Sequence, residues 1–347
     1  MQEYNAIRRK RIIYFTVITF LLVIFLILGM ITGSGIISVA DLGNIFTGKG
    51  SELQEKILFS IRLPRLFAAV LSGLALAVSG TIMQSVLRNA LGSPFTLGMS
   101  NAAAFGASLA IMMPSIVNFV PSGIAQQIVI PLSAFAWSLS GCFFILFLSR
   151  QQGASPVVMV LGGIIVSTLF AALTSGLQFF ADDSKLASIV YWHFGDLSKG
   201  TLHDVFVQAL VILPLCLYFT ANARHYNALN QGDDIAQSLG VNVKRFRLTS
   251  MIMASLITSV VVSVYGIIAF VGLVIPHIVR RLIGGNEIFL IPGTALTGAV
   301  FLLACDIISR TIISPIALPV GIVTSVIGAP VFIVLMLKSK SFYLWRS

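Results

Sequence analysis

Apolar residues along this chain gather in runs of about 20, and each run is closed by charged residues, proline or glycine. A run of that length lets an α-helix cross the hydrocarbon core of a bilayer, because each residue adds about 1.5 Å. The pattern therefore predicts an all-α polytopic membrane protein with about ten transmembrane helices. The expected spans are 12–32, 62–84, 94–113, 128–149, 156–180, 204–222, 247–267, 269–284, 288–309 and 318–338.

The composition agrees with this class. Of the 347 residues 57% are hydrophobic and 10% are charged, whereas about 25% of the residues in a soluble domain are charged. We expect a single transmembrane domain over residues 1–347, with 223–246 as its longest cytoplasmic loop. The first apolar run is too long for the h-region of a secretory signal, which has about 7–15 residues, and is predicted to be a membrane helix.

Basic residues are divided unevenly between the two sides that ten spans define. With a cytoplasmic N-terminus, fifteen Lys and Arg residues fall on cytoplasmic segments and seven on the opposite side. By the positive-inside rule, both termini are predicted to be cytoplasmic. The cytoplasmic set is Arg8, Arg9, Lys10, Arg11, Arg88, Arg150, Arg224, Lys244, Arg245, Arg247, Arg280, Arg281, Lys338, Lys340 and Arg346. The opposite set is Lys49, Lys56, Arg62, Arg65, Lys185, Lys199 and Arg310. The net charge of +10 is thus attributed to loops that face an anionic leaflet, with no nucleic-acid partner.

A polar and broken stretch, Gly80 to Gly98, interrupts the apolar pattern with Gln84, Arg88, Asn89 and a Ser-Pro pair. In lipid, polar side chains and unpaired backbone groups persist where protein or a water-filled path surrounds them. This stretch therefore predicts part of a conduit at the end of the second span.

The longest cytoplasmic loop contains a second informative segment, Gly232 to Val241. Asp233 and Asp234 suit a helix N-terminus and Gly240 suits a helix end. Between them one face is apolar, formed by Ile235, Ala236 and Leu239. We interpret this segment as a docking helix for a partner protein; the alternative is an amphipathic helix in the headgroups, for which about two turns is short.

Signatures of covalent or metal chemistry are weak in this sequence. Gly43, Gly48 and Lys49 match the spacing of a phosphate loop, but Gly50 stands where Ser or Thr is needed to hold magnesium, so ATP is expected to bind another subunit. The three cysteines lie within spans without a metal-binding spacing and are interpreted as packing residues. His277 has no second ligand in periodic reach and is interpreted as structural. No catalytic residues, resident metal or cofactor are expected in this chain.

Five linked motifs, in order along nearly the whole chain, resemble the FecCD family of permeases. They are Arg62-Leu63-Pro64-Arg65; the Gly80 to Gly98 run with Gln84, Asn89, Leu91 and Pro94; Ala236 to Gly240; Phe270 to Arg280 with His277; and Leu318 to Val323 followed by Ile327 to Pro330. This family serves importers of ferric siderophores, haem or vitamin B12, and the chain is similar to the vitamin B12 importer permease.

The resemblance implies a type II ABC importer permease in the cytoplasmic membrane of a bacterium or archaeon. It implies a second permease subunit, identical or a sister chain, two cytoplasmic ATP-binding cassette subunits that use ATP and magnesium, and an extracytoplasmic substrate-binding protein. The implied cargo is an iron-siderophore-type chelate, with haem or vitamin B12 as the alternative. A different class, a proton-coupled secondary transporter, remains open because Asp306 lies within a span. An intramembrane enzyme would need a nucleophile and base pair, which His277 does not supply.

By position, the resemblance also implies residue roles. Arg62, Arg65 and Arg310 are expected to dock acidic residues of the binding protein, although Arg310 also follows Asp306 by one helical turn, which favours a local pair. Asn89 and Leu91 are expected at the cytoplasmic gate, where Ala90, Gly92 and Ser93 depart from the family pattern. The ATPase-coupling residues are expected to be Asp233, Asp234, Ile235, Ala236, Leu239 and Gly240. Apart from the resemblance, the outer segment Tyr191 to Asp196 places Trp192 and His193 near the expected outer mouth, although this segment departs from the commoner family pattern.

Overall fold

The computed structural model describes residues 2–33, 38–113 and 124–338, and all of the regular structure in these ranges is helical. The membrane-spanning helices are α1 (Gln2–Ile31), α4 (Leu63–Leu87), α5 (Met99–Met112), α7 (Ile124–Gln151), α8 (Pro156–Phe179), α10 (Leu202–Ala221), α13 (Val243–Tyr265), α14 (Val271–Ile283), α15 (Glu287–Thr311) and α16 (Val320–Lys338). The shorter elements are α2 (Val39–Phe46), α3 (Glu52–Lys56), a π-helical turn (Ile57–Arg62), α9 (Asp183–His193), a 3-10 turn (Leu197–Lys199), α11 (Ala223–Gln231) and α12 (Asp233–Ser238).

Each of the ten predicted spans coincides with one of the spanning helices, so the predicted fold class is confirmed. Within the described ranges, eight helices are long and apolar enough to cross a membrane. The other two, α5 and α14, have 14 and 13 residues and follow irregular segments of the chain. At about 1.5 Å per residue, each covers about two thirds of the hydrocarbon core. The predicted spans 94–113 and 269–284 therefore begin too early, because their first residues are not helical.

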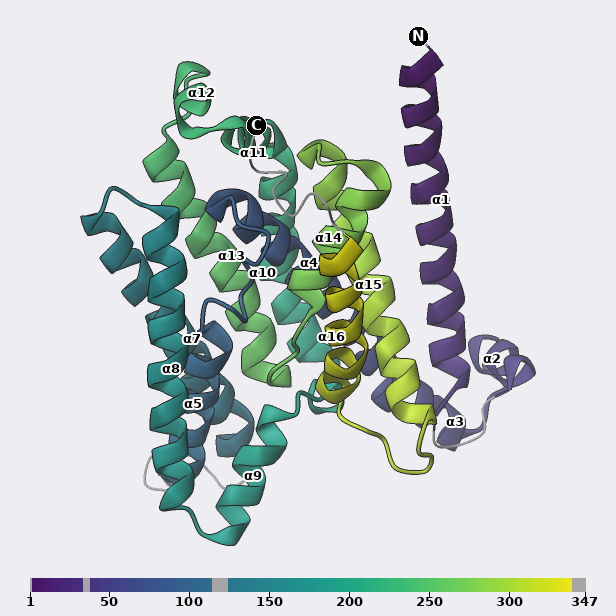
Figure 1. Cartoon of the computed structure of the whole chain (residues 1–347). Helices are drawn as coiled ribbons and strands as arrows, with labels where there is room; N and C mark the ends of the chain where they lie inside the picture. Colours follow the sequence, from purple (N-terminus) through teal and green to yellow (C-terminus); the bar gives the residue numbers. More distant parts are fainter. Residues whose placement is uncertain (1, 34–37, 114–123, 339–347) are drawn as a thin grey trace.

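The two ends of the bundle carry different elements (Figure 1). The N-terminal end of α1 lies at the same end as α11 and α12, while α2, α3 and α9 lie at the opposite end. The end with α12 is the cytoplasmic end by the charge bias of the sequence. Two residues of the predicted cytoplasmic basic set, Lys340 and Arg346, lie outside the described residues.

The helix at the centre of the bundle is α4, which packs against α15, α13, α14 and α10. Its small residues allow these close approaches: a Cβ on Gly73 would overlap the carbonyl of Gly298 in α15, and a Cβ on Gly80 would overlap the carbonyl of Gly272 in α14. Membrane helices gain stability from such tight packing because lipid is as apolar as a leucine side chain. In contrast, α1 lies at the edge of the bundle and few of its apolar side chains are fully buried.

Four short helices, α2, α3, α9 and α11, were not predicted because a search for runs of about 20 apolar residues passes over short elements. Three of them carry readable N-cap signals. Ser38 with Asp41 and Ser51 with Gln54 form capping boxes, and the Asp182 side chain accepts a hydrogen bond from the Lys185 amide. The segment with the rejected phosphate-loop spacing forms α2 and the turn after it, with no preceding strand among the described residues.

Candidate translocation gate and coupling loop

The first candidate gate element is the irregular segment that links α4 to α5. Helix α4 ends at Leu87, and the C-cap residue Arg88 has a φ of 47°, which places it in the left-handed region. The Asn89 side chain accepts a hydrogen bond from the Leu91 amide at 2.9 Å, which stabilises the turn. Leu91 is 42% exposed. The predicted gate residues thus lie immediately beyond the cytoplasmic end of α4, where a small change of backbone angle moves an exposed leucine.

Ser93 and Thr96 satisfy the backbone groups that this break leaves without helical partners. Each amide donates to the other residue's hydroxyl, at 2.9 and 3.1 Å, and the Thr96 hydroxyl also donates to the Leu91 carbonyl at 2.9 Å. Irregular backbone at membrane depth is costly unless such partners exist. Ser93, one of the positions that depart from the family pattern, therefore has a clear structural role in this chain.

A second break, Gly266 to Phe270, links α13 to α14 and packs against the first. Both segments line a small cavity, together with side chains of α4, α5 and α13. The lining includes Ser93, Pro94, Phe95, Ile268, Phe270, Leu76, Ser100 and Thr258. The cavity has a volume of about 10 Å³, which is the space of one water molecule. Two broken segments that meet inside a bundle are typical of transport sites. A cavity of this size is too small for a chelate to pass through.

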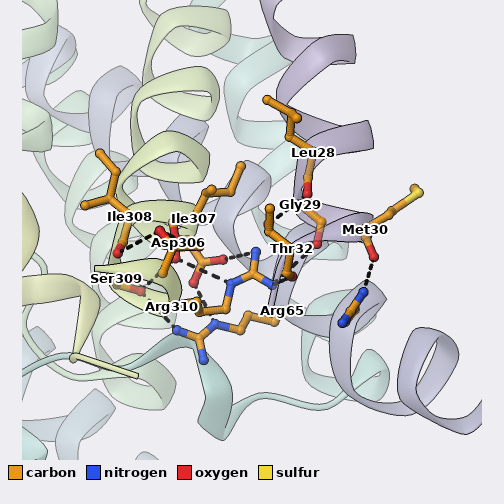
Figure 2. A network of polar contacts seen from close by, with 12 residues as sticks. Leu28, Gly29, Met30, Thr32, Arg65, Asp306, Ile307, Ile308, Ser309 and Arg310 are labelled. Atoms are coloured by element: carbon orange, nitrogen blue, oxygen red, sulfur yellow. Dashed lines mark hydrogen bonds and ion pairs between the residues drawn. The ribbon is translucent and has the colours of Figure 1, made fainter. Parts of the chain in front are cut away.

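The three outer arginines make contacts within the protein (Figure 2). Arg65 Nε donates to Asp306 Oδ1 at 2.6 Å, and Arg310 Nη2 lies 2.9 Å from Asp306 Oδ2. Arg310 also donates to the carbonyl of Thr32, and Arg62 donates to the carbonyls of Met30 and Ile31, all at the end of α1. The local Arg310 to Asp306 pair is therefore present.

This network joins α1, α4 and α15 at the outer end of the bundle. The Asp306 side chain is fully buried, and the side chains of Arg65 and Arg310 are 9% and 7% exposed. A buried carboxylate between two guanidinium groups is stable because each charge has a nearby partner. A binding protein that docks on these arginines would have to compete with the internal partners, and the docking role stays a prediction.

The outer helix α9 positions Trp192 and His193 differently from each other. Trp192 is buried against alanines of α5 and α7 and against Val262. Its side chain packs inside the bundle, and its predicted place near the outer mouth stays a prediction. His193 is half-buried, and its Nε2 has no hydrogen-bond partner among the described residues. Burial lowers the pKa of its imidazole, so neutral His193 is favoured.

The coupling segment forms the predicted short helix, α12, which begins at Asp233 and is followed by Gly240 with a φ of 84°. Ile235 is 48% exposed and Leu239 is 67% exposed. Ala236 is fully buried, so the exposed apolar ridge consists of Ile235 and Leu239, without Ala236. Adjacent residues of an α-helix point about 100° apart, so Ala236 faces the core while Ile235 faces outward.

Two charged residues connect this loop to the bundle, and the sequence analysis did not predict either of them as a site residue. Arg247 was assigned to the cytoplasmic basic set but is 2% exposed and contacts three separate elements. Glu287 is fully buried, and its Oε1 accepts hydrogen bonds from Ser85 of α4 at 2.7 Å and from Asn230 of α11 at 2.9 Å. In the sequence, a charged residue beside a span cannot be distinguished from an exposed loop residue. The burial of Arg247 and Glu287 was therefore not predicted.

Within the described residues, ten helices form a bundle with broken segments between α4 and α5 and between α13 and α14, and the short helix α12 lies exposed at one end. This architecture is typical of a membrane transport permease. The comparison with known sequences gives the particular family: the chain belongs to the FecCD transport family, which it matches over residues 21–338. An ABC transporter permease protein of Methanocaldococcus jannaschii is 45% identical over 340 residues, 97% of each chain. The hemin transport system permease protein of Yersinia pestis is 35% identical and aligns over 92% of this chain and 95% of its own length.

A solved structure supports the same assignment. It is an inward-facing conformation of a metal-chelate type ABC transporter, which superposes with a TM-score of 0.83 at 30% identity and covers 94% of this chain and 99% of its own. This chain is therefore a multi-pass permease of the FecCD type of ABC importer. In this family the ATPase is a separate subunit, and this chain is the transport permease.

Proposed function

We propose that this chain carries an iron-siderophore-type chelate across the cytoplasmic membrane of a bacterium or archaeon. In this proposal it acts as a dimer, with itself or a sister permease, and works with two cytoplasmic ATPase subunits that bind ATP and magnesium and with an extracytoplasmic binding protein. The observation that carries the proposal is the exposed ridge of Ile235 and Leu239 on α12. Asp233 at the start of α12 pairs with Arg247, which also donates to the Val86 carbonyl near the end of α4. A short apolar ridge fits a groove on a partner protein.

The mechanism follows from differential binding. ATP binding must favour one conformation of the permease over the other, since equal affinity for both conformations would shift nothing. Movement of α12 with the ATPase would then rearrange the segment around Asn89 and Leu91. The metal-chelate transporter with a similar fold supports a chelate as cargo. The hemin permease of Yersinia pestis keeps haem as an alternative cargo, and vitamin B12 remains a further alternative from the motif resemblance.

Asp306 bears on the other class, a proton-coupled transporter. A proton relay needs a carboxyl group that can exchange its proton with a path. Asp306 instead lies between Arg65 and Arg310 and forms an ion pair with each of them inside the protein. This arrangement favours a structural ion-pair network, in agreement with an ATP-driven importer.

The test is uptake into proteoliposomes that contain the permease with its ATPase, with the binding protein added outside. We expect ATP-dependent uptake of a radio-iron-labelled ferric hydroxamate siderophore, which requires the binding protein. Stronger competition by hemin or cyanocobalamin than by unlabelled siderophore would change the cargo. Uptake without any ATPase would reject the importer mechanism altogether.

Two variants test the docking surfaces in the same system. Ile235→Ser with Leu239→Ser should weaken association with the ATPase by about tenfold or more, since exposed apolar anchors dominate such interfaces. Gln152→Ser, on the exposed α7 to α8 turn, is the matched control. Reversing charge with Arg62→Glu and Arg65→Glu should weaken association with the binding protein. Unchanged affinity in a correctly folded variant would exclude that docking role.

A further inference from the structure

Arg247 lies where the coupling helix, the cytoplasmic end of α4 and the α7 to α8 turn meet. Its Nη2 donates to Asp233 Oδ1 at 2.8 Å, its Nε to the Val86 carbonyl at 3.1 Å and its Nη1 to the Ala154 carbonyl at 3.2 Å. Each of the three guanidinium nitrogens therefore contacts a different element. The planar and rigid guanidinium fixes these contacts relative to one another.

The contact with Val86 has a specific physical meaning. The last four carbonyls of an α-helix have no partner within the helix, and Val86 is the next-to-last residue of α4. Arg247 supplies a donor to one of these carbonyls, and its positive charge is favourable at the negative end of the helix dipole. Val86 is two residues before Arg88, so this contact lies within one helical turn of the gate residue Asn89.

The contact with Asp233 joins Arg247 to the first residue of α12. The Arg247 side chain is 3% exposed and the Asp233 side chain is 39% exposed, so the pair runs from the protein interior to the docking helix. Breaking an ion pair that is buried on one side is costly, because the buried guanidinium is left without a counter-charge and without water to replace it. A movement of α12 must either carry Arg247 with it or break this pair.

The position of Arg247 on its own helix is unfavourable. It is the fifth residue of α13, close to the positive end of the helix dipole, where a further positive charge is repelled. Burial of the charge adds to this cost unless partners surround it. The three contacts offset that cost, and they come from the elements that a coupling mechanism has to connect.

We propose that Arg247 is a positioning residue for transport, which transmits movement of α12 to the cytoplasmic end of α4 and so to the gate segment Arg88 to Gly98. This inference rests on the proposed function, because movement of α12 is driven by the ATPase in that proposal. The arginine acts through Val86 and Asp233 and touches neither cargo nor ATP in this role. A second polar cluster joins α11 to α15 and α4: Asn227 of α11 accepts a hydrogen bond from the Glu287 amide, and the Glu287 carboxylate accepts one from Ser85.

The experiment measures the gate directly. Leu91→Cys is introduced as a reporter, and its rate of labelling by a maleimide is measured in inverted vesicles with the ATPase, with and without a non-hydrolysable ATP analogue. With native Arg247 we expect nucleotide to change the labelling rate. With Arg247→Met that nucleotide-dependent factor should shrink by about fivefold or more, the lower part of the range for coupled sites, while ATP binding by the ATPase persists.

Three further variants make the outcome specific. Asp233→Ala removes the link to α12 and leaves the contacts to Val86 and Ala154, so it should reduce the response even if Arg247→Met fails to fold. The double variant Asp233→Ala with Arg247→Met should lose little more of the response than either single variant, because both changes interrupt the same connection. Arg247→Lys should restore part of the response, since lysine keeps the charge but not the fork. Arg245→Met, exposed on the same helix, is the matched control and should respond normally.

The results distinguish this inference from the proposed function. A normal nucleotide response in folded Arg247→Met, or in Asp233→Ala, overturns the role of Arg247 and leaves the importer intact. If nucleotide does not change the labelling rate of Leu91→Cys when Arg247 is native, ATP-driven gating is contradicted, and the role of Arg247 is rejected as well. A loss that Arg245→Met shares would show that the effect is a general one of charge on α13 and would also overturn the inference.

Discussion

Asp306 forms ion pairs with two guanidinium groups inside the outer end of the bundle. Its two oxygens contact Arg65 and Arg310 separately, and those arginines also contact Ser309 and the end of α1. The sequence predicted the pair of Asp306 with Arg310 from its spacing of one helical turn. It could not predict the pair with Arg65, because 241 residues separate the partners.

We therefore expect Asp306→Asn to destabilise the folded protein by about 3–5 kcal/mol, because two buried positive charges would lose their counter-charge. The measurement is thermal unfolding in detergent, followed by reaction of the cysteines with a thiol-reactive dye. Asp182→Asn is the control, since it makes the same chemical change at an exposed helix cap that asparagine also suits. Equal melting temperatures for the two variants would refute a stabilising role for Asp306.

His193 gives the outer end a pH dependence with a definite sign. Burial lowers the pKa of His193 below its usual value near 6.5, so the folded protein binds this proton less readily than the unfolded chain. The stability that depends on neutral His193 is complete above the unfolded pKa and is lost as the pH falls through the folded pKa.

On acidification from pH 7.5 to 5, the melting temperature of the wild-type protein should therefore fall more than that of His193→Gln. Glutamine keeps a polar side chain of similar length but does not titrate in this range. Melting curves of both proteins at several pH values give the difference, in which the contributions of other titrating groups cancel. Parallel pH profiles would mean that His193 does not respond to acid in the folded state.

At the scale of helices, the closest contacts are made where glycine faces glycine. Gly73 of α4 lies against Gly298 of α15, where a Cβ on either residue would overlap the backbone of the other. The contact between Gly80 and Gly272 brings α14 onto α4 just before the gate segment. Only the tertiary structure shows which helices approach each other at these glycines.

Gly80→Ala should therefore destabilise the bundle by about 1–3 kcal/mol, because a methyl group would have to push α14 away from α4. Gly176→Ala, in α8, is a matched control, since a Cβ at that position meets nothing within 4 Å. Thermal unfolding of both variants in detergent measures the difference. Comparable stability of the two variants would show that α4 and α14 can separate without cost.

For the whole molecule, the charge bias and the structure together predict which ends of the helices share a side. Cysteine placed at Ser238 of α12 should react with a membrane-impermeant maleimide in inverted vesicles, and cysteine placed at Ser184 of α9 should react in intact cells. Both serines are exposed. Of the native cysteines, Cys142 and Cys305 are buried, which keeps the background low. Labelling of both positions from one side would contradict the predicted topology.

By itself the sequence indicated the class, about ten spans and the position of the short helix α12, all of which the structure contains, and it predicted the direction of the spans, which stays a prediction. These features follow from local rules: the length of an apolar run, the charge beside it, and capping residues near Asp233 and Gly240. It also placed Asn89 and Leu91 next to the end of a membrane helix, because polar residues and Pro94 interrupt the apolar pattern there.

Only the tertiary structure decided which side of each element faces the protein. It assigned Ala236 to the buried face of α12, brought Arg65 to Asp306, and placed Arg247 between Asp233 and Val86. Such contacts join residues far apart in sequence, and whether a charge next to a span is buried depends on partners that come from other helices. Local patterns carry no information on those partners, so the roles of the buried charges became visible only in the folded bundle.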